Sequence, residues 1–142
     1  MSLEDLGNIG EFVAAVAVVV SLIYLAIQIR QNTRTVRSAS YQSIVNTAND
    51  LGHNFTRAPG FTALWVQGAG DPGQLNEEQL VTLKAHLVGV FRFYENVFYQ
   101  HQQGTIDPKL WPGWQHDMLR WFNRPGFRQI WQDIGQRYSA EF

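Results

Sequence analysis

Residues 12–29 read FVAAVAVVVSLIYLAIQI, and this stretch decides how the rest of the chain is interpreted. It contains no charged residue, no proline and no glycine. At about 1.5 Å rise per residue, a helix over this stretch is about 27 Å long, close to a bilayer core of about 30 Å. The stretch therefore predicts a membrane-spanning helix.

Two other interpretations fit a run of this kind, the central helix of a soluble protein and a cleaved signal peptide. A chain of 142 residues offers too little protein to bury such a helix on all sides. Signal peptides begin with a basic leader, whereas Glu4, Asp5 and Glu11 make the first eleven residues acidic. We therefore expect a permanent anchor.

Basic residues lie on one side of the apolar stretch only. No Lys or Arg precedes it, and Arg30, Arg34 and Arg37 follow it closely. The positive-inside rule then predicts an external N-terminus and a cytoplasmic C-terminal part. We expect these three arginines to meet anionic lipid headgroups, at about 1 kcal/mol each.

Small and polar residues recur along the predicted membrane helix at heptad spacing, which places them on one face. They are Gly10, Ala14, Ala17, Ser21, Tyr24, Gln28 and Gln31. Helices in a bilayer associate through close contacts over small residues and through interhelical hydrogen bonds. This face predicts a helix–helix interface, with copies of the chain or with another membrane protein; a chance distribution is the alternative.

The chain beyond the anchor has helical patterns and no strand pattern, so we expect an all-α protein. Between Gly10 and Gly52 there is no glycine or proline, which predicts that the helix continues as a stalk. The stalk has an apolar stripe of its own, at Tyr41, Ile44, Ala48, Leu51 and Phe55. The predicted organisation is an anchor over 1–30, a stalk over 31–58 and an aromatic-rich helical domain over 59–142.

Four helices are expected in the domain, over residues 61–69, 76–103, 107–122 and 127–138. Asn76 and Gln79 have the spacing of a capping box, and Gly104 suits the C′ position. Asp107-Pro108 is typical of a helix start. The second of these helices is expected to be central, since Leu83, Leu87, Val90, Phe91 and Tyr94 form one apolar side and Val81, Ala85, Val88 and Val97 a second.

No catalytic, cofactor or metal constellation is found in the sequence. There is no cysteine, and the four histidines lack the spacing of a metal site. A net charge of −1 argues against nucleic-acid binding. We expect Glu95 to pair with Arg92 three residues earlier. An aromatic pocket near Tyr94, Glu95, Trp111 and Trp114 is the alternative kind of site.

Three segments of the chain resemble one known group of proteins. They are GEFVAAVAVVVSLIYLAIQIRQNTRTVRSASYQ (10–42), FRFYENVFYQHQQGTIDPKLWPGWQ (91–115) and YSAEF (138–142). The chain is similar to a widespread family of bacterial single-span membrane proteins, most specifically in YLAIQIRQNTR. The resemblance implies a helical protein of the bacterial inner membrane and carries no activity or catalytic residue.

Together these observations predict a non-enzymatic membrane subunit. It would assemble through its membrane helix, as a homo-oligomer or as an accessory chain of a larger complex, with lipid as its other partner. The alternative is a membrane-tethered module that binds a small molecule or lipid in the aromatic pocket.

Overall fold

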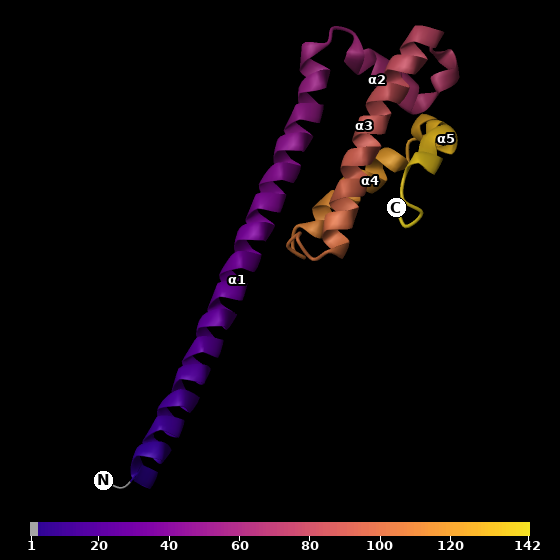
Figure 1. Ribbon diagram of the computed structural model, residues 1–142. Coiled ribbons are helices and arrows are strands. Elements are labelled where there is room, and N and C mark those ends of the chain that lie inside the picture. Colours follow the sequence, from indigo (N-terminus) through magenta and orange to yellow (C-terminus); the bar gives the residue numbers. More distant parts are fainter. Residues whose placement is uncertain (1–2) are drawn as a thin grey trace. The chain divides into compact units, whose positions relative to one another are not determined.

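The computed structural model describes residues 3–142, apart from the side chains of Asp5, Asn54 and Thr56. Within that range the regular structure is helical (Figure 1). The elements are α1 (Leu3–Arg57), α2 (Phe61–Gly70), α3 (Glu77–Gln102), α4 (Trp111–Phe122) and α5 (Pro125–Ile134), with 3-10 turns at Pro72–Gln74 and Gly135–Arg137. The predicted all-α fold, a long apolar N-terminal helix followed by a helical bundle, is confirmed.

The chain forms two compact units, and the boundary between them lies within α1, between Ser38 and Ala39. The C-terminal part of α1 thus belongs to the second unit, where Ile44 is only 1% exposed. Three further members of the predicted stripe, Ala48, Leu51 and Phe55, pack against the same core. Tyr41 remains 38% exposed.

Helix α3 is the centre of the second unit. Its predicted capping box is confirmed, because Gln79 N–H donates to Asn76 Oδ1 (2.9 Å) and Asn76 N–H donates to Gln79 Oε1 (3.0 Å). Leu83, Leu87 and Phe91 are fully buried. At its other end Gly104 has φ of +67°, as expected for a C′ glycine.

The second apolar side predicted for α3 is wrong in its N-terminal half. Val81 is 62% exposed and Ala85 is exposed. The contacts of α2 and α5 with α3 cover the side that carries Leu83, leaving these two positions in solvent. Val97, farther along the helix, is buried.

The last two helices begin at other residues than predicted. Helix α4 starts at Trp111 rather than after Asp107, because Asp107 closes a tight turn instead. Its side chain accepts from Lys109 N–H (2.9 Å) and its carbonyl from Leu110 N–H (2.8 Å). Helix α5 starts at Pro125, two residues early, since proline suits the first turn, and a 3-10 turn replaces its expected end.

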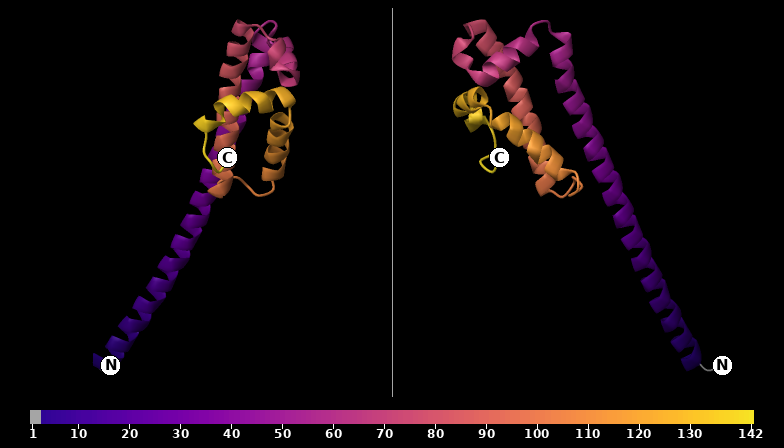
Figure 2. Two further views of the ribbon diagram at one scale, coloured as in Figure 1. Left: turned by 90° about the vertical axis from the view of Figure 1, so that its right-hand side faces the viewer. Right: turned by 180° about the vertical axis from the view of Figure 1, so that it is seen from behind.

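Aromatic rings fill the core of the second unit. Trp65 of α2 meets Phe127 of α5 with ring centroids 4.6 Å apart, and Phe91 of α3 meets Phe122 of α4 at 4.7 Å. Figure 2 shows α4 returning beside α3 and α5 crossing them, in agreement with the contacts among the three helices. Burying each such ring stabilises the fold by about 1.5–3 kcal/mol.

Candidate functional site

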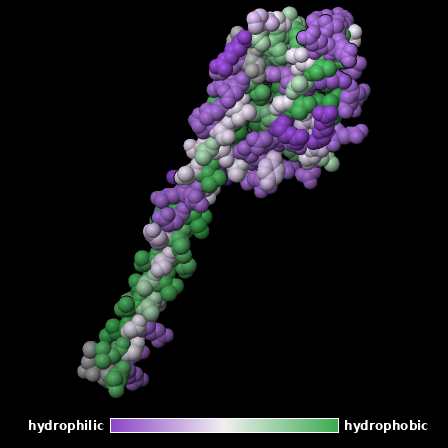
Figure 3. Space-filling model, turned by 45° about the horizontal axis from the view of Figure 1, so that its top comes forward, coloured by the Kyte–Doolittle hydropathy of each residue, from purple (hydrophilic) through white to green (hydrophobic). Residues whose placement is uncertain are grey.

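The apolar part of α1 is the first candidate site, because nothing in the first unit covers it. Of the described helices, α1 is the one long and apolar enough to cross a membrane, with a mean hydropathy of 2.6 in its most apolar window and none of that window buried. Hydrophobic atoms cover this part of the helix on the face shown in Figure 3. Soluble monomers rarely expose a continuous apolar surface of this extent.

The residues of the predicted helix–helix interface all lie on α1, and all are exposed. Ser21 does not need a partner from another helix, since its hydroxyl donates to the Ala17 carbonyl at 2.8 Å. The Gln28 side chain has no hydrogen bond to any residue in the described range 3–142. Gln28 is therefore a position on this face, within the apolar stretch, whose amide is open to a polar partner from another helix.

The three arginines predicted to meet headgroups also lie on α1, where they begin directly after the apolar stretch and extend over the next two turns. Arg30, Arg34 and Arg37 are exposed and separated by four and three residues. This spacing places their side chains on one face of the helix. They thus form a compact basic patch at one end of the apolar segment.

A cavity of about 220 Å³ within the second unit is the second candidate site. Helices α1, α2, α3 and α4 contribute its walls, which are mainly aromatic. Its lining residues are Ala48, Leu51, Gly52, Phe55, Trp65, Val90, Phe93, Tyr94, Trp114, Asp117 and Trp121. Two residues of the predicted aromatic pocket, Tyr94 and Trp114, are thus brought together here.

Tyr94 and Asp117 form the polar part of this cavity. The Tyr94 hydroxyl donates to Asp117 Oδ2 at 2.8 Å across α3 and α4. Burial, and then the neighbouring Asp117 carboxylate, raise the pKa of Tyr94. The phenol thus stays protonated and remains a donor to the carboxylate.

Trp65 contributes an unpaired donor to the same region. Its side chain lines the cavity and is 5% exposed. Among the residues that the structure describes, none accepts a hydrogen bond from its indole N–H. The indole nitrogen itself is fully buried within the aromatic packing, and an unpaired buried donor of this kind costs about 1–3 kcal/mol.

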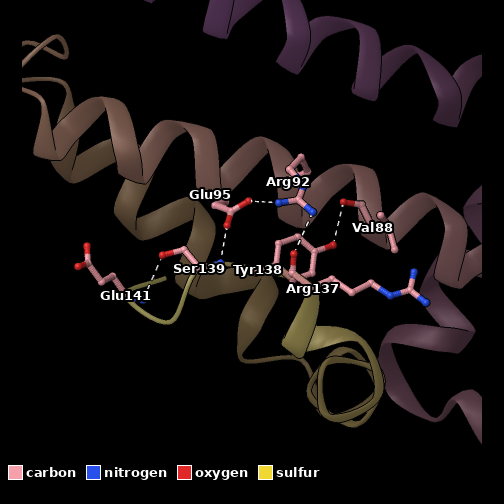
Figure 4. A network of polar contacts seen from close by, with 7 residues as sticks. All are labelled: Val88, Arg92, Glu95, Arg137, Tyr138, Ser139 and Glu141. Atoms are coloured by element: carbon pink, nitrogen blue, oxygen red, sulfur yellow. Dashed lines mark hydrogen bonds and ion pairs between the residues drawn. The ribbon is translucent and has the colours of Figure 1, made fainter.

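Glu95, predicted in the same pocket as Tyr94, lies in a polar network elsewhere on α3 (Figure 4). The predicted ion pair with Arg92 is present. Glu95 Oε1 also accepts from Ser139 N–H at 2.6 Å, and Arg92 donates to the Arg137 carbonyl at 3.1 Å. Glu95 and Arg92 therefore hold the C-terminal segment against α3.

Tyr138 completes the attachment of that segment. Its hydroxyl donates to the Val88 carbonyl at 3.1 Å, and the Arg92 guanidinium lies 4.6 Å from the centre of its ring. Burial raises the pKa of Tyr138.

An open groove of about 570 Å³ runs past this network, with Phe93, Tyr99 and Glu95 among its walls.

Trp111, the remaining residue of the predicted pocket, lies against the end of α3. Its ring stacks on His101, with centroids 3.8 Å apart and planes 2° from parallel. This stack joins the start of α4 to the last turn of α3, so its role is in packing.

Within residues 3–142 as described, no three His, Cys, Asp or Glu side chains gather as metal ligands do.

Sequence reasoning placed two of the lining residues in a pocket, Tyr94 and Trp114, and missed the others, among them Trp65, Asp117 and Trp121. Asp117 is 23 positions from Tyr94, so no local spacing connects them. A carboxylate among tryptophans was the one signal that could have drawn attention to it.

The described features define an all-α protein with one candidate membrane span and an aromatic cavity in its second unit. No protein-family model, curated protein or solved structure matches the chain. The resemblance to bacterial single-span membrane proteins stays a prediction, and function is argued from the residues themselves.

Proposed function

We propose that this protein is a non-enzymatic, membrane-anchored subunit that assembles through its single membrane helix, as a homo-oligomer or as an accessory chain of a larger complex. One observation carries the proposal. Twelve large hydrophobic side chains between Phe12 and Ile29 are each at least 46% exposed. Lipid or a partner helix must cover this surface for the protein to be stable in a cell.

The distribution of residues around α1 supports assembly in addition to anchoring. An isolated anchor gains nothing from collecting its small and polar groups on one side, because large apolar side chains are more favourable in lipid. Gly10, Ala14 and Ala17 allow another helix to approach closely, and Gln28 supplies an unpaired amide for a bond between helices. The interface of the proposal is this face.

The proposed location is the inner membrane of a bacterium, with residues 30–142 in the cytoplasm. The support is the basic patch of Arg30, Arg34 and Arg37 on one side and the acidic leader on the other. Because the chain has no cysteine, a single introduced thiol tests this orientation without background.

Orientation and insertion are tested with Asn8→Cys and Gln136→Cys, both at exposed positions. In intact cells, a membrane-impermeant maleimide should label Asn8→Cys at once and Gln136→Cys only after the membrane is opened. The opposite labelling would overturn the orientation. Release of the protein from membranes by alkaline carbonate would overturn the membrane span itself.

Assembly is tested by native mass spectrometry of the full-length protein, extracted gently from its own membrane. Ala17→Phe should abolish the assembly because it adds a ring on the proposed interface. Ala26→Phe is the matched control, since nine residues of helix rotate it about 180° from position 17. A bare monomer from the unmodified chain, or equal effects of the two variants, would refute the interface.

The same measurement separates the two forms of the proposal. An integer multiple of the chain mass identifies a homo-oligomer. Foreign chains that leave the complex in Ala17→Phe and remain in Ala26→Phe identify an accessory subunit.

A further inference from the structure

The 220 Å³ cavity differs from an ordinary packing defect in the composition of its walls. Six of its lining residues are aromatic: Phe55, Trp65, Phe93, Tyr94, Trp114 and Trp121. They form two connected series of edge contacts. Trp65 contacts Phe55 at 5.1 Å and Trp121 at 5.3 Å, while Phe93 contacts Tyr94 at 5.1 Å and Trp114 at 5.9 Å.

Asp117 is the one charged residue among those that line the cavity. Its Oδ2 accepts from Tyr94, which holds the carboxylate in place without neutralising it. Arg120 acts electrostatically on Tyr94 and lies 5.5 Å from the ring centre of Trp121, but it does not line the cavity. A carboxylate and aromatic faces both attract positive charge.

The size of the cavity restricts the ligand. Pockets that bind drug-sized molecules have volumes of about 300–1,000 Å³, whereas a cavity of about 150 Å³ holds a molecule the size of benzene. A volume of about 220 Å³ therefore suits a compact group of a few carbon atoms and a short polar extension.

We propose that this cavity binds a small methylated ammonium compound, of which choline is one example. The aromatic walls and Asp117 contact the methylated cation. This site lies in the second unit and is independent of how α1 assembles.

Other ligand classes fit less well. An anion would meet the Asp117 carboxylate and the negative faces of the rings. A neutral apolar molecule would fill the volume and leave the carboxylate unused. A primary ammonium is strongly hydrated and loses more on entering an aromatic site than a methylated one, whose charge is spread over its methyl groups.

Titration calorimetry on the full-length protein tests the proposal. A maltoside detergent is used, because choline-based detergents would compete for the site. Choline should bind, and its neutral isostere 3,3-dimethylbutan-1-ol should bind at least tenfold more weakly because it lacks the charge. Equal affinity for the two compounds, or no binding of choline at millimolar concentration, would overturn the proposal.

Variants locate the binding. Asp117→Asn removes the charge and keeps an acceptor for the Tyr94 hydroxyl, so the fold should persist while choline affinity falls at least tenfold. Asp133→Asn is the control, since it removes one carboxylate from an exposed pair with Lys84 outside the cavity. Unchanged choline affinity in Asp117→Asn would refute the site.

A second variant covers the case in which Asp117→Asn fails to fold. Trp114→Leu keeps an apolar wall at a partly exposed position and removes its π face. Choline binding should weaken while binding of the neutral isostere stays the same. An equal loss for both compounds would show that the wall acts by shape alone and would overturn the cation-binding proposal.

Discussion

Gly126 is the position at which a single methyl group should do most damage. It lies in the first turn of α5, and a Cβ there would stand 1.9 Å from the Gly68 carbonyl oxygen of α2 and 2.9 Å from Pro72 Cδ. The nearest atom, the Gly68 oxygen, belongs to the backbone, so rotation of a side chain cannot relieve the contact. Gly126→Ala must therefore push α2 and α5 apart.

The expected cost follows from this geometry. Overpacking a core costs about 1–3 kcal/mol, and a backbone collision belongs at the upper end, at about 3 kcal/mol. For a unit of this size each kcal/mol lowers Tm by about 4–8 °C, so we expect a fall of about 12–24 °C. Gly113→Ala is the matched control because it also follows a proline in the first turn of a helix, but has nothing within 4 Å.

Thermal unfolding followed by tryptophan emission measures this effect in the full-length protein. All five tryptophans lie between Trp65 and Trp131, so the signal reports the second unit alone. Gly113→Ala should raise Tm slightly, because a permitted Gly→Ala change stabilises the folded protein by about 0.4–1 kcal/mol. If Gly126→Ala melted within about 2 °C of the unmodified protein, the close contact of α2 with α5 would be refuted.

Two further predictions concern single polar groups. Glu95→Gln should lower the free energy of unfolding by about 1.5 kcal/mol, because the hydrogen bond from Ser139 N–H loses its charged acceptor. Amide hydrogen exchange should then accelerate over residues 138–142. Unchanged exchange at Ser139 would contradict this attachment. Burial lowers the pKa of His86, so the unfolded chain binds its proton more tightly and stability should fall as the pH drops below about 6.5. Tm measured between pH 7.5 and 5 should decline less in His86→Gln, and an equal decline in both proteins would show that other groups cause it.

Two kinds of feature could be predicted from the sequence, those set by composition and those set by neighbours along the chain. An uninterrupted apolar run and the absence of strand patterns led to the all-α fold and the candidate span. The capping box at Asn76 and the C′ glycine at Gly104 were found because both depend on interactions within one helical turn. The Arg92–Glu95 pair was found for the same reason.

Features that depend on several helices at once could not be predicted. Asp107 is a different case, because its residue type suits both an N-cap and a local turn, and it closes a turn with Lys109 and Leu110 before α4 begins. Val81 is as apolar as the buried Val97, but the helices that pack on α3 reach only one of them. Burial depends on what lies opposite a residue, which a pattern on one helix does not contain.

The candidate cavity shows the same division. Sequence reasoning placed Tyr94 and Trp114 in an aromatic pocket, and both line the cavity, whereas Glu95 and Trp111 lie in other contacts. Tyr94 and Glu95 are adjacent in the chain, but successive residues of a helix point about 100° apart. The sequence by itself determined which residues are apolar, aromatic or charged along each helix. Only the tertiary structure decided which of them meet, because those contacts join residues far apart in the chain.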